Sequence, residues 1–173
     1  MKYPIGIQDF EDLQRNGYAY VDKTNFVYKL ADEGKYYFLS RPRRFGKSLF
    51  LSTLEAYFQG KKELFKGLAI YDLETEWKKY PIFHIDLNTA NFREKDSLYT
   101  VLNDYLTTWE SKYGARESEA KLALRFKGVI ARAAEKEGCG VVILIDEYDK
   151  PILQTLRDPE LQAEHRAQLK AFY

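Results

Sequence analysis

The segment at residues 40–48 constrains the fold most, because it joins an apolar run to a run with helical periodicity. Residues 36–39 are aromatic and aliphatic without alternation, which is typical of a central parallel strand buried on both faces. Residues 49–58 place apolar side chains three and four positions apart, as a helix packed on a sheet does. A strand, a tight turn and a helix start in succession aim backbone N–H groups and the helix dipole at one point. The segment therefore predicts an anion-binding loop.

The end of this loop, Gly46-Lys47-Ser48, matches the second half of the phosphate-binding pattern G-x-x-x-x-G-K-[ST]. In that pattern the lysine reaches the terminal phosphates of a nucleotide, and the hydroxyl takes one coordination position on Mg²⁺. The first glycine of the pattern is missing, because Arg41 stands at its position. Taken alone, these residues are equally compatible with a solvated basic turn before a surface helix.

A second stretch supplies what the loop lacks. Residues 141–145 are five aliphatic residues, and Asp146 and Glu147 follow at once. A buried parallel strand delivers the residues after it to the carboxyl edge of the sheet, where ligands bind in open α/β folds. Asp146 would hold Mg²⁺ opposite Ser48, and Glu147 would orient and deprotonate the attacking water. The alternative, a strand that ends in a solvated acidic turn, loses weight because the two motifs complement each other.

The rest of the chain predicts the elements that connect these motifs. Residues 81–87 read as another strand, and Asp86 near its end either lies beside the nucleotide site or caps the following loop. Two helical stretches within residues 95–137 form the long crossover that parallel strands need. We also expect a short helix near 9–16, a short strand at 18–21, a helix that starts near Asp22 or Thr24, and a final helix over 160–173.

Composition excludes several other classes. Lys and Arg number 27 against 26 Asp and Glu, so the net charge of +1 gives no overall field for nucleic acid or an anionic membrane. A single cysteine, Cys139, excludes an intrachain disulfide and a thiolate zinc cluster. The longest aliphatic run is far shorter than the ~20 residues of a membrane span. We expect a globular cytoplasmic protein.

Four stretches together resemble the bacterial AAA-ATPase-like family, and the resemblance covers nearly the whole chain. They are Pro-Ile-Gly-Ile-Gln-Asp-Phe at 4–10, Tyr-Val-Asp-Lys-Thr at 20–24, the loop with its Arg-Pro-Arg-Arg-Phe-Gly-Lys-Ser form at 41–48, and Leu-Ile-Asp-Glu-Tyr-Asp-Lys-Pro at 144–151. The missing first glycine is then a trait of the family. The resemblance implies an α/β P-loop NTPase fold, with three αβα layers around a mostly parallel sheet, that uses ATP and Mg²⁺.

The resemblance also implies the roles of the site residues. Lys47 and Glu147 would be catalytic, while Ser48 and Asp146 would hold the metal. The nucleotide would bind along the loop, where Arg43 and Arg44 flank the phosphates: the cofactor-binding residues are Arg43, Arg44, Phe45, Gly46, Lys47, Ser48 and Leu49. A basic turn without a specific ligand remains the alternative for Arg43 and Arg44.

The family resemblance predicts that residues 1–173 are the N-terminal part of one such domain. Further strands, and often a PD-(D/E)XK nuclease-like domain, would follow in the complete protein. The favoured function is Mg²⁺-dependent ATP hydrolysis that drives or regulates an attached partner domain. The alternatives are a nonhydrolysing nucleotide switch that controls a nuclease or protein partner, and a nucleic-acid-binding module, which the near-neutral charge disfavours. Residues 5–10 and 20–24 either read the base or only pack the edge of the sheet.

Overall fold

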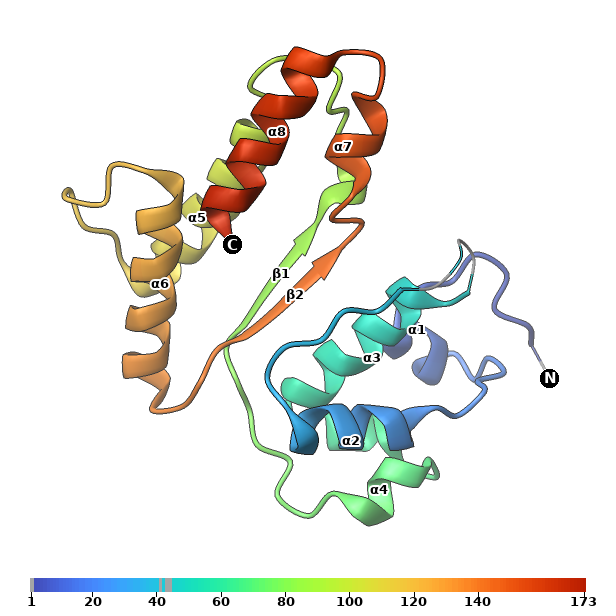
Figure 1. Ribbon diagram of the computed structural model, residues 1–173. Helices are drawn as coiled ribbons and strands as arrows, with labels where there is room; N and C mark the ends of the chain where they lie inside the picture. The colour runs from blue at the N-terminus through green and yellow to red at the C-terminus, as the bar shows by residue number, and fades with distance from the viewer. Residues whose placement is uncertain (1, 41, 43–44) are drawn as a thin grey trace. The chain divides into compact units, whose positions relative to one another are not determined.

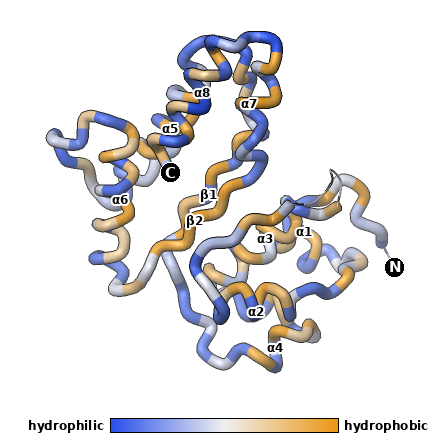
Figure 2. The backbone as a smooth tube through the Cα atoms, viewed as in Figure 1, coloured by the Kyte–Doolittle hydropathy of each residue, from blue (hydrophilic) through white to orange (hydrophobic). Residues whose placement is uncertain are grey.

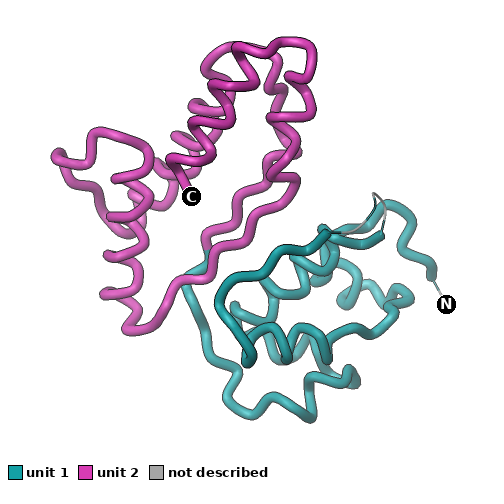
Figure 3. The backbone as a smooth tube through the Cα atoms, viewed as in Figure 1, with its two compact units in different colours: residues 1–82 teal, residues 83–173 magenta. Residues whose placement is uncertain are grey.

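The computed structural model describes residues 2–40, 42 and 45–173, and they form two compact units, residues 1–82 and 83–173 (Figure 3). Each unit is described by itself. The cofactor-binding prediction for Arg43 and Arg44, and the missing glycine position at Arg41, lie outside the described residues.

The first unit is built from short helices around an aromatic core (Figure 1). Phe10 and Phe65 have ring centroids 4.9 Å apart, and Phe65 lies 5.2 Å from Trp77. Val27, Ala56 and further side chains complete this core. The elements in chain order are α1 (Phe10–Arg15), α2 (Thr24–Glu33), α3 (Lys47–Phe58), the 3-10 helix η1 (Lys62–Phe65) and α4 (Ala69–Leu73).

Helix α3 begins at Lys47, two residues before the predicted helical run 49–58, and ends before Gly60. Its fully buried face carries Thr53 and Ala56, while Leu54 and Tyr57 pack partly buried against the core. The Thr53 hydroxyl donates a 2.8 Å hydrogen bond to the Leu49 carbonyl, so its polar group is satisfied inside the unit. Small side chains thus bring α3 close to its neighbours in the core.

The second unit contains a small parallel sheet and its crossover (Figure 1). Strands β1 (Ile82–Asp86, beginning one residue before the unit) and β2 (Val142–Asp146) pair directly. The chain passes from β1 to β2 through η2 (Leu87–Thr89), α5 (Ser97–Tyr113) and α6 (Leu122–Glu137), and continues as α7 (Lys150–Gln154) and α8 (Pro159–Phe172). The predicted strands and helical crossover are confirmed.

The core of the second unit joins one face of β1 to the helices. Phe83 and Ile85 alternate with less buried residues along β1 and pack with Leu98, Leu102 and Leu106, which lie four positions apart on α5. Helix α8 closes this core through Phe172, whose ring stacks on Phe126 at 4.3 Å. Apolar residues run along both strands and give way to hydrophilic ones beyond their carboxyl ends (Figure 2). The fold therefore places polar chemistry at that edge.

The prediction of a buried strand at residues 36–40 is wrong. These residues have no regular secondary structure, and the side chains of Tyr36 and Phe38 are 94% and 70% exposed. The expected strand at 18–21 is reduced to a single parallel bridge between Lys2 and Tyr18. An apolar run becomes a strand only where a neighbouring strand satisfies its backbone groups, and the first unit has no named strand among its described residues that precede Ile82. The described sheet has two strands, a smaller α/β arrangement than the expected three-layer fold.

Candidate functional site

The phosphate-loop half of the candidate site is the N-terminus of α3. Gly46 is the N-cap residue and has φ +72°, a left-handed conformation that glycine adopts without strain. The cap carries no side-chain hydrogen bond, and the first turn contains no acidic residue. The first N–H groups of a helix have no partner within the helix, so this end presents donors and a positive dipole to an anion. Lys47 and Ser48 are the first two residues of that helix.

The two remaining described residues of the predicted loop differ in their surroundings. The side chain of Phe45 is largely exposed, directly before the Gly46 cap. Leu49 packs against the core of the first unit, and its carbonyl accepts the hydrogen bond from Thr53. Leu49 would therefore contribute to phosphate binding through its backbone N–H, because its side chain serves to anchor the helix.

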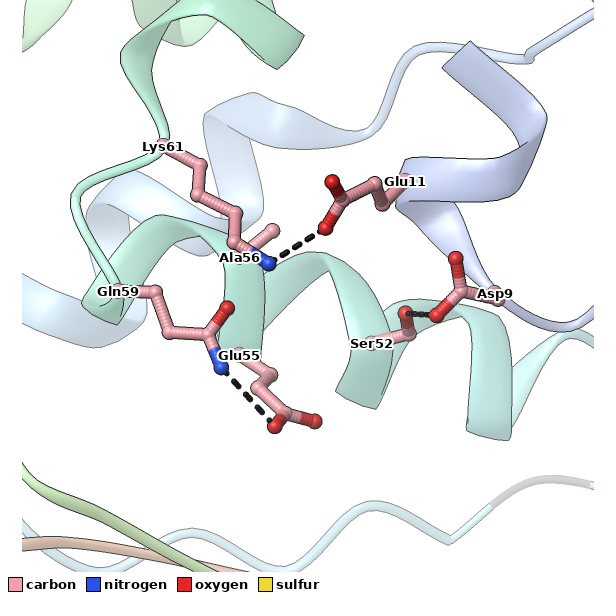
Figure 4. Close-up of a pocket in the computed structure, with 7 residues that line it drawn as sticks. All are labelled: Asp9, Glu11, Ser52, Glu55, Ala56, Gln59 and Lys61. Carbon is pink, nitrogen blue, oxygen red and sulfur yellow. Dashed lines mark hydrogen bonds and ion pairs between the residues drawn. The ribbon is translucent and has the colours of Figure 1, made fainter. Parts of the chain in front are cut away.

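A polar hollow beside α3 shows how the helix is held (Figure 4). The Ser52 hydroxyl accepts a 2.9 Å hydrogen bond from the Phe10 N–H and donates a 3.3 Å bond to Asp9. Across the hollow, Lys61 and Glu11 form an ion pair of 2.5 Å. The hydrogen bond from Lys61, aided by one from Arg15, lowers the pKa of Glu11. The Glu11 and Lys61 charges therefore link α1 to the turn that follows α3.

The segments proposed to read the base divide into buried and exposed residues. Phe10 and Thr24 are fully buried in the first unit. The Thr24 hydroxyl accepts a hydrogen bond of 3.1 Å from the Ile70 N–H, which shows the packing role of this segment. The side chains of Ile5 and Val21 are 92% and 78% exposed. Base reading remains a prediction, and these two exposed side chains are where it would be sought.

Asp22 explains why α2 begins where it does. Its Oδ1 accepts hydrogen bonds from the N–H and hydroxyl of Thr24 at 2.8 and 2.7 Å, although Lys23 is the N-cap residue. Its Oδ2 accepts from the Ala69 N–H at 2.7 Å. Burial raises the pKa of Asp22, but the hydrogen bonds from Ala69 and Thr24 outweigh it, so the pKa lies below its usual value. The carboxylate thus links α2 to α4.

The acidic half of the candidate site lies at the carboxyl end of β2. Asp146 is the last residue of the strand, and its Oδ1 accepts a 2.9 Å hydrogen bond from the Glu147 N–H. Glu147 has φ +53°, which is unusual for a residue with a side chain. The Glu147 carbonyl accepts from the Lys150 N–H at 2.9 Å and closes a turn into α7. Both carboxylates are partly exposed, so a ligand can reach this edge.

Asp86 ends the neighbouring strand β1 at the same edge of the sheet. Its Oδ1 accepts a 2.7 Å hydrogen bond from the Asn88 N–H, and its backbone N–H donates to the Tyr105 hydroxyl at 3.0 Å. The capping role that the sequence left open is confirmed. A role beside a nucleotide stays a prediction.

The two halves belong to different units, Lys47 and Ser48 to the first and Asp146 and Glu147 to the second. Their donor types nevertheless suit one ligand set. Mg²⁺ prefers oxygen ligands, and commonly takes one or two from the protein and the rest from phosphates and water. The Ser48 hydroxyl and the Asp146 carboxylate are both oxygen ligands, and their binding of one Mg²⁺ stays a prediction. Among the described residues no group of three His, Cys, Asp or Glu side chains could hold a metal by itself.

An open helix N-terminus that begins at Lys47 after Gly46, and an acid pair at the end of a parallel strand, are features typical of α/β proteins that bind nucleotides. A family model described as Predicted AAA-ATPase matches residues 4–173, and the chain belongs to this family. The expected family is therefore confirmed. The nuclease-like domain associated with the resemblance is not part of that match.

The chain is also similar to a curated protein of Azotobacter chroococcum mcd 1, described as an uncharacterized protein in the vnfD 5'region. The two are 41% identical over 173 residues, which is 99% of this chain and 34% of the relative. The chain thus spans about a third of the relative's length. No solved structure matches. In the described part of the chain, no helix combines the length and apolar character required to cross a membrane.

Proposed function

We propose that this chain binds ATP with Mg²⁺ and hydrolyses it, as part of a P-loop NTPase domain with the three-layer αβα fold. The observation that carries the proposal is the N-terminus of α3, where Gly46 in a left-handed conformation opens an uncapped helix at Lys47 and Ser48. Such a terminus binds phosphate through its N–H groups and dipole. The family membership and the acid pair after β2 support the same conclusion.

The proposed mechanism assigns one task to each group. The first N–H groups of α3 and the Lys47 ammonium bind the phosphates and stabilise the negative charge that grows during phosphoryl transfer. Ser48 and Asp146 would hold Mg²⁺, which would supply positive charge to neutralise the phosphates. Glu147 orients a water molecule and accepts its proton as that water attacks the terminal phosphorus, while the bond from this phosphorus to the bridging oxygen breaks and ADP leaves. Arg43 and Arg44 are proposed to flank the phosphates.

The test separates binding from turnover in two variants. Lys47→Ala should weaken the binding of a fluorescent ATP analogue, because a phosphate contact is lost. Glu147→Gln should keep that binding and lower turnover by about 10²- to 10⁴-fold, the contribution typical of general base catalysis. Lys127→Met, an exposed position on α6, is the matched control and should change neither.

Two results would contradict the proposal in different ways. Turnover that persists in both variants would place hydrolysis elsewhere or in a contaminant. ATP that binds tightly to the wild type and is recovered intact would favour the nonhydrolysing switch. Coupling to a partner domain, including a nuclease-like domain or nucleic acid bound through it, is a proposal for the whole protein and needs the longer chain.

A further inference from the structure

The turn between β2 and α7 holds its first residue in an unfavourable conformation. Glu147 has φ +53°, in a region where a Cβ crowds the backbone. A hydrogen bond from its N–H to Asp146 and another from the Lys150 N–H to its carbonyl keep it there. Strain of this kind persists only where the surroundings over-determine it, and it is frequent at functional sites. A contact outside the turn also holds Glu147 in this conformation.

Lys150 makes that outside contact. Its Nζ donates to the backbone carbonyl of Asn88 and to the Asn88 Oδ1, the latter at 3.1 Å. Asn88 is itself fixed, because its N–H donates to Asp86 Oδ1 at 2.7 Å. The residue that closes the turn at Glu147 is therefore anchored on the loop after β1, at the same edge of the sheet. We call Lys150 with Asn88 the turn anchor.

Two further contacts make this loop a firm base for the turn anchor. The Phe92 N–H donates to Gln154 Oε1 on α7 at 2.7 Å. The Phe92 carbonyl lies 2.9 Å from the Nε2 of His165, a fully buried side chain on α8. The loop is thus tied to both helices that follow the acid pair. A shift of the Lys150 side chain should therefore move the turn at 147–150 more than the loop after β1.

We propose that Lys150 is a positioning residue, which aims the Glu147 carboxylate by holding the 147–150 turn against the end of β1. The inference rests on the proposed function, since it assumes that Glu147 acts on the attacking water. The side chain of Lys150 donates to two neutral oxygens of Asn88. Its removal should therefore affect the orientation of Glu147 and leave phosphate binding intact.

Kinetics of Lys150→Met test the positioning role. A methionine keeps the aliphatic stem and removes the donor. We expect kcat to fall about 10- to 100-fold, the range for a misplaced catalytic group, with the affinity for an ATP analogue unchanged within about threefold. Lys150→Arg should recover most of the turnover, because a guanidinium donates to the same oxygens. The exposed Lys127→Met again serves as the control.

A double variant distinguishes positioning from general loss of structure. If Lys150 acts through Glu147, then Lys150→Met should lower kcat no further when Glu147 is already Gln. A full additional loss in that background, a parallel loss of ATP affinity, or unchanged turnover of Lys150→Met would each overturn the inference while leaving the proposed function standing.

Hydrogen exchange provides a readout that does not depend on turnover. The N–H of Glu147 and the N–H of residue 150 both donate within the turn, so their exchange should become faster in Lys150→Met and recover in Lys150→Arg. Unchanged exchange would overturn the turn anchor itself. The wild type could also bind ATP without hydrolysing it while exchange is faster in Lys150→Met. That result would support the turn anchor, but it would overturn the hydrolytic function and the catalytic use of the anchor.

Discussion

Gly128→Ala tests how tightly α6 packs against the loop that precedes it. Gly128 lies inside α6, where replacement of glycine with alanine ordinarily stabilises a helix by about 1 kcal/mol. A Cβ at this position would lie 2.0 Å from Glu119 Oε1 and 2.4 Å from its Cδ. The carboxylate cannot stay where it is. The expected gain in helix propensity is therefore opposed by the displacement of Glu119.

The displacement breaks a well-placed ion pair. Arg132 Nη1 donates to Glu119 Oε1 at 2.6 Å, and the exposed fractions of the two side chains are only 14% and 12%. Arg132 would keep its 2.9 Å bond to the Gly114 carbonyl. Because a carboxylate that leaves a mostly enclosed guanidinium takes away its charge partner, we expect Gly128→Ala to lower the free energy of unfolding.

The sign of the effect should reverse in a second background. In Glu119→Ala the obstacle is absent, so Gly128→Ala should raise the free energy of unfolding by about 1 kcal/mol and Tm by roughly 2–4 °C. Urea and thermal unfolding of the four proteins in this double-mutant cycle, followed by circular dichroism, measure both effects. Equal stabilisation by Gly128→Ala in the two backgrounds would refute the described packing of Glu119 on α6.

The remaining predictions concern two other carboxylates and the Glu119 pair at low pH. Asp22→Ala should lower the free energy of unfolding, measured in urea, by about 1–3 kcal/mol, because it removes the acceptor for N–H groups of α2 and α4. Asp104→Ala, at an exposed position, is the control and should have little effect. The hydrogen bond from Arg132 lowers the pKa of Glu119 from its usual 4.5, so the stability that it contributes is present above pH 4.5 and is lost as the pH falls through the lowered pKa. The difference in stability between wild type and Glu119→Gln should therefore shrink in acid, and a constant difference would contradict the ion pair. Glu147→Gly should raise the free energy of unfolding by about 1 kcal/mol, since glycine adopts positive φ without strain. The same variant should abolish ATP turnover. A lower free energy of unfolding would show that other contacts of Glu147 outweigh its backbone strain.

Long periodic segments were predictable because their pattern and their burial have the same cause. Leu98, Leu102 and Leu106 repeat at the helical spacing, and all three are fully buried on α5. The aliphatic residues of β2 and the strand at β1 also follow from local composition. In these elements the apolar side chains need no distant information to select helix or strand.

The prediction of a strand before the phosphate loop failed for the opposite reason. The apolar run at 36–39 favours a strand locally, but a strand also needs a hydrogen-bonded neighbour, which local sequence does not encode. The turn anchor could not be predicted for the same reason, because Asn88 and Lys150 are far apart in the sequence and meet only through the pairing of β1 with β2. Of the candidate site, the residue types were predictable and their long-range contacts were not.

The two turns of the candidate site differ in how well the residue type at the positive-φ position suits the backbone. Both place a residue at positive φ, +72° at Gly46 and +53° at Glu147. At Gly46 the residue type is the one that the backbone favours. At Glu147 glycine or asparagine would suit the backbone better, so geometry alone does not account for a glutamate there. Trp77 and Asp96 also have positive φ, +46° and +60°, so the strain at Glu147 motivates the proposed role of its carboxylate, and kinetics of the Glu147 variants must test it.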